Sequence, residues 1–464
     1  MKNLVLTFRE DMNISEGNEG DIFLQNDILS LNIDRPSQGI KTFIEKLNGD
    51  GGTEDELADM VTEMDGLQGV SLFYYYLERF FRLSVICRTI YYNGKPFATI
   101  EPFSYYFIWK DSDELKDEKF ILSRFALIRR EKNRFIMESP LSFCRIILHN
   151  GFDIINFLYK EHTREDIYKL TGMEKHTVNG FLSLLVNNNF LVKPEEEENN
   201  ETLQQWEFHD LLFHSRHRIG RHNYPNGATY PFLNKIDPQP AFKKPAGTGI
   251  NLFKPDMEKL MTDDYPFSLI VEERESVRSY GDIPVTVEQL GEFLYRTYRV
   301  KEVKDSADGG EMYQVTVRPC AGGGACYELE IYPVINKCEG LSSGIYHYDP
   351  VNHRLHRLTE RNETVEALIN RAHVSAVKLC YPEILLIITA RFQRVSWKYR
   401  GMAYATILKN VGVLYQNMYL IATAMELSPC ALGNGDADLF CRAAGLDYLS
   451  ESPVGEFMLG RKRI

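Results

Sequence analysis

Residues 274–278 read Arg-Glu-Ser-Val-Arg, and residues 460–463 near the end of the chain read Gly-Arg-Lys-Arg. A phosphate monoester is held well by planar, permanently charged donors, and two arginines with a hydroxyl between them supply such donors. Arg-x-Ser-x-Arg alone is also common on solvated surface. Because a second basic cluster stands at the C-terminus, we expect the tail to fold back and share one anion with the first cluster. The expected anion ligands are Arg274, Ser276, Arg278, Arg461 and Arg463.

A glycine-rich turn lies between these two clusters. Residues 318–325 read Arg-Pro-Cys-Ala-Gly-Gly-Gly-Ala, and strand-like stretches at 313–318 and 329–335 flank them. Glycines allow a backbone to approach a flat ring without an intervening side chain. A plain flexible loop is the alternative for the same residues.

A long apolar helix is expected from about Trp397 or Tyr399 to about Glu426, because apolar residues recur there at three- and four-residue spacing. Lys398 would then lie in its first turn. The positive end of the helix dipole disfavours an ammonium group and lowers its pKa, which suits a general base. The alternative is that Lys398 forms a salt bridge and Tyr399 only packs.

From about Pro266 to Ile464 the chain resembles the FMN-dependent nitroreductase superfamily, and within it the oxidases that convert azolines to azoles in ribosomally made peptides. The cyanobactin thiazoline oxidases are the most similar group, since they carry a long N-terminal extension of this kind. Four motifs in the order of the family carry the resemblance. They are residues 274–278, the turn 318–325 with Glu328 to Tyr332 after it, Lys398-Tyr399, and Ser428 to Gly433.

The resemblance implies an FMN whose phosphate lies on the arginine clusters and whose ring contacts Pro319, Cys320, Ala321, Gly322, Leu432 and Gly433. It implies Lys398 as the base and Tyr399 as its partner in a two-electron oxidation of a thiazoline or oxazoline. It also implies a homodimer in which both chains contact each flavin. The sequence departs from the family pattern at Cys320-Ala321 and at Glu328, where a proline is more usual, which leaves individual flavin contacts in that turn open.

The first half reads as a repeated unit. Thr53-Glu-Asp-Glu56 and Thr163-Arg-Glu-Asp166 each place a hydroxyl three residues before an acid, the pattern of a capped helix start. Apolar stripes lie before and after each cap, and hairpin-like stretches such as 125–137 flank the helices. We interpret this half as two tandem winged-helix-like modules, so the fold class is α+β. The expected domains are 1–110, 111–214, a proline-rich linker or arm at 215–265, and the nitroreductase-like domain at 266–464.

A winged helix often binds DNA, but charge argues against that partner here. The formal net charge is −12, and the expected recognition helix after Met173 begins with only Lys175 and His176 as basic groups. The acidic run 195–198 is expected to be a solvated wing tip. We therefore expect no nucleic acid, and a precursor peptide held by strand addition to the edge of the wing, as the resemblance also implies.

Composition limits the remaining possibilities. The 464 residues predict two or three domains, and the 8 cysteines show neither CxxC pairing nor zinc spacing, so reduced thiols are expected. The histidines between residues 209 and 222 lack matching carboxylates, so no metal is expected. No stretch has the length of a membrane span or of a signal peptide, which favours a cytoplasmic protein without a membrane partner.

Two other functions remain as alternatives at this stage. An NAD(P)H-dependent nitroreductase for small aromatics would share every flavin motif, although it has no need of a peptide-holding half. A flavin-sensing regulator that binds DNA through its winged helices is the other, and its weak basic surface counts against it.

Overall fold

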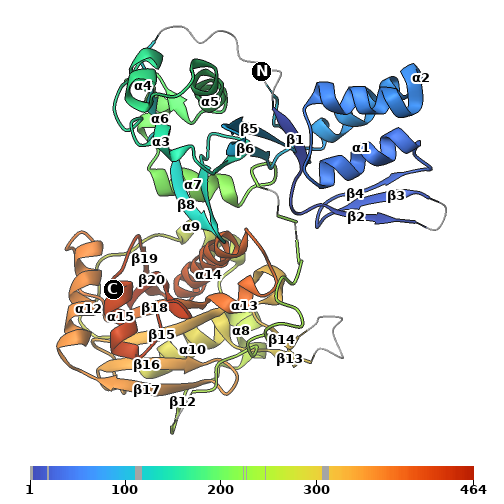
Figure 1. Cartoon of the computed structure of the whole chain (residues 1–464). Helices are drawn as coiled ribbons and strands as arrows, with labels where there is room; N and C mark the ends of the chain where they lie inside the picture. Colours follow the sequence, from blue (N-terminus) through green and yellow to red (C-terminus); the bar gives the residue numbers. More distant parts are fainter. Residues whose placement is uncertain are drawn as a thin grey trace. The chain divides into compact units, whose positions relative to one another are not determined.

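The computed structural model describes residues 4–17, 20–109, 118–222, 224–225, 227–245, 247–305 and 313–463. The chain forms two compact units, residues 1–225 and residues 226–464 (Figure 1). The expected boundary between residues 110 and 111 lies outside the described residues. The stretch expected as a linker or arm, 215–265, is divided between the two units.

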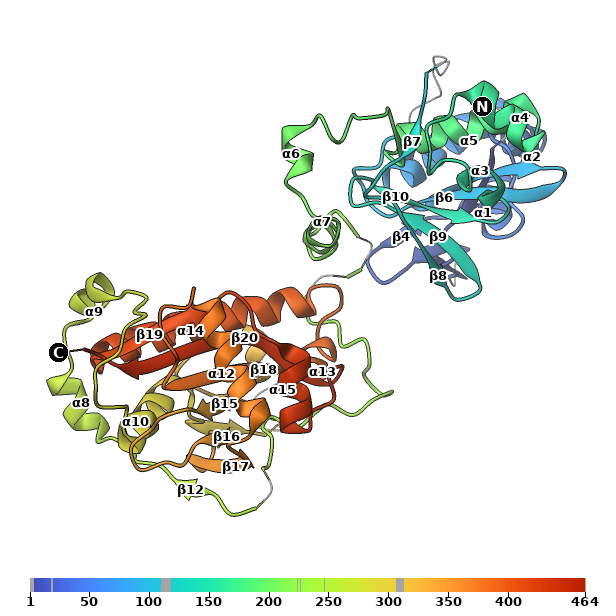
Figure 2. The same cartoon turned by 90° about the vertical axis from the view of Figure 1, so that its left-hand side faces the viewer.

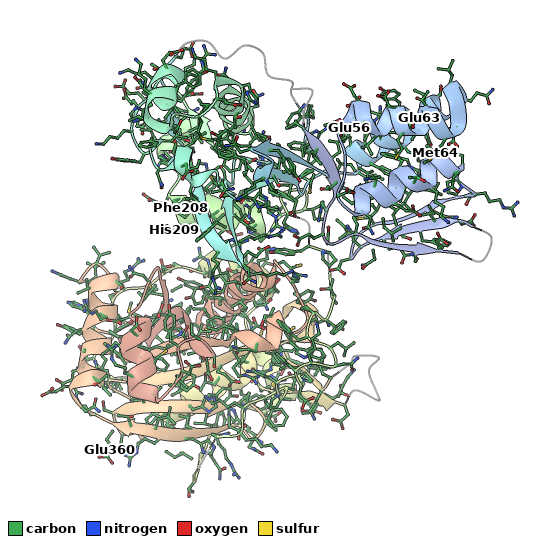
Figure 3. All side chains as sticks on the ribbon, in the orientation of Figure 1. Glu56, Glu63, Met64, Phe208, His209 and Glu360 are labelled. Atoms are coloured by element: carbon green, nitrogen blue, oxygen red, sulfur yellow. The ribbon has the colours of Figure 1, made fainter. Side chains whose placement is uncertain are left out.

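The first unit begins with a small sheet and two helices. The antiparallel strands β2 (Asn13–Glu16), β3 (Ile22–Gln25) and β4 (Ser30–Ile33) pack with α1 (Gln38–Asn48) and α2 (Glu54–Arg82) around an apolar core that includes Phe43, Phe73 and Phe80. The expected capping box at Thr53 and Glu56 is confirmed, since each side chain accepts a hydrogen bond from the backbone of the other residue. Figure 3 labels Glu56 at this helix start.

A larger antiparallel sheet joins the two expected modules within the first unit. Its strand order is β1-β5-β6-β10-β9-β8. The strands are β1 (Val5–Phe8), β5 (Ile86–Tyr92), β6 (Lys95–Pro102), β8 (Leu127–Glu131), β9 (Arg134–Glu138) and β10 (Cys144–Leu148). The expected hairpin at 125–137 is β8 and β9. Strands from both expected modules pair in this sheet, since β6 pairs with β5 and with β10. Backbone hydrogen bonds therefore connect the two modules.

The rest of the first unit is largely helical. Its elements are α3 (Phe152–Ile155), α4 (Arg164–Thr171), α5 (Lys175–Asn187), α6 (Glu201–Gln204), α7 (Phe208–Arg216) and the short pair β7 (Ile121–Leu122) with β11 (Leu191–Val192). The Thr163–Asp166 capping box is confirmed. The stripe expected on α5 is also confirmed, with Val178, Phe181 and Leu185 buried.

Two expectations for the first unit are wrong. The stripe expected after the first cap, from Leu72, Tyr75, Tyr76 and Leu83, is wrong in part. Leu72 and Tyr75 are exposed, Tyr76 and Leu83 pack partly buried against the core, and Phe73 and Leu77 are buried instead. The acidic run is not wholly solvated either. Glu197 is buried, and it accepts hydrogen bonds from Ser123 Oγ at 2.5 Å and from the Arg124 amide at 2.9 Å.

The second unit has a seven-stranded antiparallel sheet between two layers of helices. The strand order is β12-β17-β16-β15-β18-β20-β19. The strands are β12 (Ile250–Asn251), β15 (Leu329–Ile335), β16 (Gly344–Asp349), β17 (Arg354–Glu360), β18 (Ile384–Arg391), β19 (Leu427–Leu432) and β20 (Glu451–Arg461). β16 and β17 form an antiparallel hairpin, and every residue of β18 is buried.

Alternating residues of these strands face the two helix layers. One face packs against α10 (Val287–Tyr298) and α14 (Ala403–Ala424), and the other against α12 (Glu363–Ser375) and α15 (Ala437–Ala444). β18 is buried throughout its length because both faces are covered. The unit also contains the small hairpin of β13 (Glu302–Lys304) and β14 (Val315–Val317).

Three short helices complete the second unit. They are α8 (Met257–Asp263), α9 (Phe267–Glu273) and α13 (Phe392–Ser396). α8 and α9, drawn yellow-green at the left of Figure 2, bury no residue within their own chain. Apolar side chains on both are exposed, with Met261 at 79% and Phe267 at 69%.

The described residues include no helix that is long and apolar enough to cross a membrane. Among the same residues, no group of three or more histidine, cysteine, aspartate or glutamate side chains has the arrangement of a metal site.

Candidate functional site

The glycine-rich turn is fixed by contacts within its own chain. Gly323 N–H donates to Asn410 Oδ1 at 2.9 Å, and a Cβ on Gly323 would lie 2.6 Å from Thr406 Cγ2. A Cβ on Gly324, whose φ is 62°, would collide with Tyr399 Oη. The glycines are therefore required by the packing of α14 and Tyr399, which differs from the expected approach to a ligand ring.

The residues before these glycines divide into exposed and buried positions. Pro319 and Ala321 are exposed and Gly322 is half-buried. Cys320 packs into the core, and burial raises the pKa of its thiol to about 11. The turn can thus offer backbone and the exposed positions to a ligand, while the Cys320 thiol faces inward.

Lys398 is enclosed beside this turn. Its side chain is 4% exposed, and Nζ donates to the Gly324 carbonyl at 3.0 Å. The same Nζ lies 5.6 Å from the ring centroid of Tyr313 and 5.9 Å from those of Tyr230 and Tyr399. The structure therefore brings the expected base, its expected partner and the glycine-rich turn together.

The expected position of Lys398 at a helix opening is wrong. α13 ends at Ser396 and α14 begins at Ala403, so Lys398 and Tyr399 lie in the connection between the two helices. Gly401, with a φ of 75°, interrupts the helical course. The premise that Lys398 lies in the first turn of the long helix therefore fails.

An arm from the start of the second unit holds this connection. The Thr229 and Tyr230 amides donate to the Lys398 carbonyl at 3.1 and 3.2 Å. Trp397 Nε1 donates to the Ile236 carbonyl at 2.6 Å, and Arg391 Nη1 to the Pro240 carbonyl at 2.7 Å. The proline-rich stretch after residue 226 is therefore packed against the end of β18 and the connection that contains Lys398.

Arg394 on α13 ties three segments to one another. Its guanidinium donates to the carbonyls of Cys326 at 2.9 Å, Gln239 at 2.7 Å and Gln314 at 2.6 Å. Burial lowers the pKa of this guanidinium to about 10. The arm, the approach to β14 and the end of the glycine-rich turn thus share one buried donor, which the sequence did not indicate.

Glu328 is also internal. It is completely buried, burial raises its pKa, and Oε1 accepts a hydrogen bond from Asn410 Nδ2 at 2.9 Å. Asn410 therefore connects Glu328 with the Gly323 amide. The carboxyl group of Glu328, which stands where the family usually has proline, is thus hydrogen-bonded inside the protein.

The Arg-x-Ser-x-Arg segment follows α9 and runs beside β19 and the end of β20. The Val277 amide donates to the Pro429 carbonyl at 2.8 Å, and the Gly281 amide to the Arg461 carbonyl at 3.0 Å. The two basic clusters are therefore adjacent through their backbones, although residues 278 and 461 are far apart in sequence. Arg274, Arg278 and Arg461 are half-buried, and Ser276 and Arg463 are exposed.

Two side chains in this segment have distinctive surroundings. Ser276 Oγ lies 2.8 Å from Tyr419 Oη, and the Arg274 guanidinium lies 5.4 Å from the ring centroid of Tyr419. Arg278 Nε is buried without a hydrogen-bond partner in the described part of the chain. A buried guanidinium N–H without a partner is costly, and an anionic ligand would satisfy it.

The expected ring contacts at β19 differ in exposure. Leu432 is buried among the residues that pack on α12 and α15, and Gly433 is exposed. The next stretch turns into α15, where Asp436 accepts a hydrogen bond from the Leu439 amide as the helix cap. The side chain of Leu432 thus belongs to the core, and any ligand contact there would use backbone.

Family comparisons match the chain in three consecutive blocks. A model described as a ThcOx helix-turn-helix domain matches residues 1–107, one described as cyanobactin oxidase ThcOx matches 120–223, and the Nitroreductase family matches 271–461.

Curated relatives match less than half of the chain. "Putative nitroreductase MJ1384" of Methanocaldococcus jannaschii is 27% identical over 40% of this chain and 85% of the relative. The microcin B17-processing protein McbC of Escherichia coli is 25% identical over 30% of this chain and 52% of McbC. The trifolitoxin-processing protein TfxB of Rhizobium leguminosarum is 26% identical over 30% of this chain and 38% of TfxB.

Solved structures show a weaker likeness. The E. coli microcin synthetase McbBCD complex with truncated pro-MccB17 matches with 18% identity and a TM-score of 0.35, over 51% of this chain and 82% of the matched chain. A nitroreductase family protein from Clostridium difficile matches with 12% identity and a TM-score of 0.28, over 43% and 85%. The assignment rests on the three family models and the sequence relatives. Residues 271–461 thus match the nitroreductase family, the two regions before them match models of the cyanobactin oxidase ThcOx, and these matches together make the chain an oxidoreductase.

Proposed function

We propose that this protein is an FMN-dependent azoline oxidase, which converts thiazolines or oxazolines in a ribosomally made peptide to thiazoles or oxazoles. The single observation that carries the proposal is the enclosed Lys398. A small-molecule reductase has no need for a buried amine held beside Tyr399 and the glycine-rich turn.

The arginine segment fits the phosphate of FMN. The buried Arg278 Nε without a partner, the half-buried Arg274 and the exposed Ser276 hydroxyl lie on one short segment beside β19. Arg461 and Arg463 follow on the adjacent end of β20. The remaining contacts, to the flavin ring, would come from the backbone of two stretches. These are residues 319–322, which include Cys320, and residues 432–433. FMN, when bound, would supply the two-electron acceptor.

Lys398 would remove the proton from the carbon α to the peptide carbonyl in the azoline ring. A base must be fixed within hydrogen-bond reach of the proton that it removes, and the bond to the Gly324 carbonyl fixes Nζ in that way. Tyr399 would orient the ring or relay the proton, because its hydroxyl packs against the same glycine. Aromaticity of the azole makes the product stable.

The first unit is proposed to hold the precursor peptide. β8 is the outermost strand of the larger sheet, so a peptide strand can add to it. β1, at the other margin, already exchanges hydrogen bonds with Gly52 at Leu6, which blocks strand addition there. The basic residues Lys175 and His176 of α5 pair with Glu165 and Glu174, which leaves little positive surface for nucleic acid.

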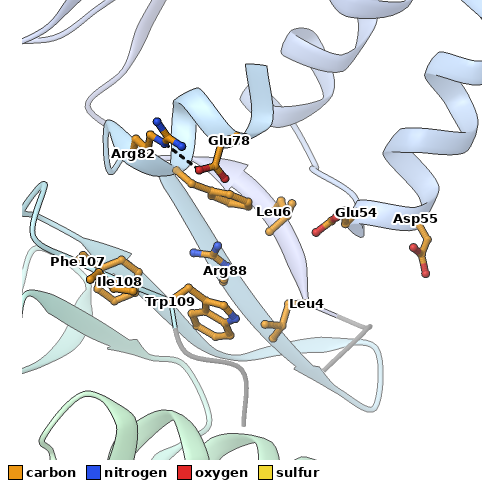
Figure 4. A pocket seen from close by; sticks show the side chains of 11 residues that line it. Leu4, Leu6, Glu54, Asp55, Glu78, Arg82, Arg88, Phe107, Ile108 and Trp109 are labelled. Atoms are coloured by element: carbon orange, nitrogen blue, oxygen red, sulfur yellow. Dashed lines mark hydrogen bonds and ion pairs between the residues drawn. The ribbon is translucent and has the colours of Figure 1, made fainter. Parts of the chain in front are cut away.

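A pocket beside β1 offers a second contact for a peptide. Its volume is about 780 Å³, and Figure 4 shows Arg88 near Trp109 among the lining side chains, with Glu54 and Asp55 to one side. The Arg88 guanidinium lies 4.4 Å from the centroid of Trp109. The pocket combines apolar and charged walls, which suits a peptide side chain.

A homodimer in the cytoplasm is part of the proposal. The exposed apolar residues of α8 and α9, such as Met261 and Phe267, would be covered by the second subunit. Asn410 and Tyr419 stand nine residues apart on α14, so the base region and the arginine segment are separated by about 14 Å along the helix. A flavin between two subunits could contact one region from each chain.

The direct test uses the purified full-length protein and a peptide that contains azolines. The expected result is a yellow protein that removes two hydrogen atoms per ring, seen by intact-mass analysis. Conversion of nitroaromatics with NAD(P)H, together with an unchanged peptide mass, would refute the proposal.

A further inference from the structure

Tyr419 on α14 joins the two segments that the proposed function assigns to the flavin. Its hydroxyl accepts a hydrogen bond from the Ala431 amide of β19 at 2.8 Å and lies 2.8 Å from Ser276 Oγ. Its ring carries the Arg274 guanidinium at 5.4 Å and packs edge-on against Phe457 at 5.1 Å. No motif in the sequence singles out this tyrosine.

The hydrogen-bonding capacity of the three groups allows a directed chain of bonds. A tyrosine hydroxyl has one proton to donate and can accept, and a serine hydroxyl has the same capacity. The Ala431 N–H is a donor only, so Tyr419 Oη accepts from it. When Tyr419 donates its own proton to Ser276 Oγ, the Ser276 proton is free to point outward at an anion.

We propose that Tyr419 is a positioning residue that makes Ser276 a hydrogen-bond donor to a phosphate monoester. The inference rests on the proposed function, because FMN is the phosphate ester concerned. A chain of hydrogen bonds from the Ala431 amide through Tyr419 to Ser276 polarises the serine hydroxyl and strengthens its bond to an anion. The Tyr419 ring supports Arg274 on the same side by a cation–π contact.

Tyr415 offers a closely matched control one helical turn earlier. Its hydroxyl accepts a hydrogen bond from a strand amide, that of Glu456 at 2.7 Å, and its ring packs against Phe457 at 6.0 Å. The two tyrosines therefore share helix, ring neighbour and type of hydrogen bond. They differ in the contacts with Ser276 and Arg274, which belong to Tyr419.

The experiment compares FMN with riboflavin, which lacks the phosphate. Dissociation constants are measured by quenching of flavin fluorescence on apo-protein, with the wild type, Tyr419→Phe, Tyr415→Phe and Ser276→Ala. The wild type is expected to bind FMN more tightly than riboflavin. Tyr419→Phe should bind FMN about tenfold more weakly, the size of one lost charge-assisted bond, and riboflavin as the wild type does. Tyr415→Phe should leave both constants unchanged.

The double variant Tyr419→Phe/Ser276→Ala tests whether Tyr419 acts through Ser276. The expected constant for FMN equals that of Ser276→Ala alone, because the serine is the only route. An additional tenfold loss in the double variant would overturn the inference, and so would an equal loss of FMN and riboflavin in Tyr419→Phe. If the wild type prefers FMN and Tyr419→Phe keeps that preference, the inference fails and the phosphate site stands. If the wild type binds both flavins equally, the phosphate site itself fails.

Ser276 is exposed, so its replacement by alanine does not threaten folding and provides a reading even if Tyr419→Phe were unstable. In that case Ser276→Ala should weaken FMN about tenfold and leave riboflavin unchanged. If Ser276→Ala leaves the dissociation constant of FMN unchanged, the serine does not bind the phosphate and Tyr419 cannot act through it. That result would also overturn the inference.

Discussion

Replacing Arg394 with methionine should loosen the enclosure of Lys398. The arginine is 2% exposed and donates to the carbonyls of Cys326, Gln239 and Gln314. Methionine fills a similar volume but leaves these three acceptors without their donor. Because Cys326 closely follows Gly324, which accepts the Lys398 amine, the change should also reach the proposed base.

The magnitude follows from two opposing effects. Each carbonyl that loses its donor costs about 1–3 kcal/mol, so three cost roughly 3–9 kcal/mol. Burial of the charged guanidinium is itself unfavourable, since it lowers the pKa of Arg394 from 12.5 to about 10. That shift corresponds to about 3 kcal/mol, which the methionine variant regains. The difference between the two effects is roughly 0–6 kcal/mol, so the net loss of folding stability should be about 3 kcal/mol, the middle of that range.

Urea unfolding of the full-length protein measures this loss, and turnover of an azoline peptide measures the effect on the base. The matched control is Arg442→Met, which removes an exposed arginine from the last turn of α15 and should change stability by less than about 0.5 kcal/mol. We expect Arg394→Met to lower the urea midpoint and to slow turnover. An Arg394→Met protein with the midpoint and turnover of the wild type would refute the role given to these three bonds.

Three further predictions concern charge, cofactor and arm. Burial raises the pKa of Glu456 from 4.5 to about 7, so the folded protein holds a proton that the unfolded chain releases, and stability should fall as pH rises through that window. The fall in stability amounts to about 3 kcal/mol, and Glu456→Gln should remove it. Melting curves of both proteins near pH 5 and near pH 8 measure the difference. An equal pH dependence in the two proteins would contradict the prediction. Arg274→Ala should bleach the purified protein, as measured by the ratio of flavin to protein absorbance, and full occupancy would count against the phosphate assignment. Trp397→Phe removes the donor to the Ile236 carbonyl, so it should lower the free energy of unfolding by about 1–3 kcal/mol and speed proteolysis of the arm. An arm as resistant to protease as in the wild type would argue against that contact.

Local patterns in the sequence were sufficient for the helix starts and for several strands. A hydroxyl three residues before an acid predicts a capping box from neighbouring residues alone, and the boxes at Thr53 and Thr163 both form. The strand-like stretches expected at 313–318 and 329–335 likewise contain β14 and β15. These features depend on a few consecutive residues, so tertiary contacts rarely override them.

The position of Lys398 and the reason for the glycines needed contacts between distant residues. The connection around Lys398 leaves helical geometry because residues 228–230 of the arm bond to it, which helical periodicity does not reveal. The glycines are explained by Thr406 and Tyr399, which lie more than seventy residues further along the chain. Ser276 and Tyr419 are 143 positions apart, so no spacing rule could pair them.

The central claim is that Lys398 acts as the base in an oxidation coupled to a bound flavin. The most direct measurement is the rate at which flavin absorbance is lost when an azoline peptide is mixed without oxygen with the wild type or with Lys398→Ala. Both proteins should carry the same amount of flavin, and the variant should lose its absorbance about 100-fold more slowly, the usual scale for a general base. A Lys398→Ala protein that is reduced as fast as the wild type would contradict the claim.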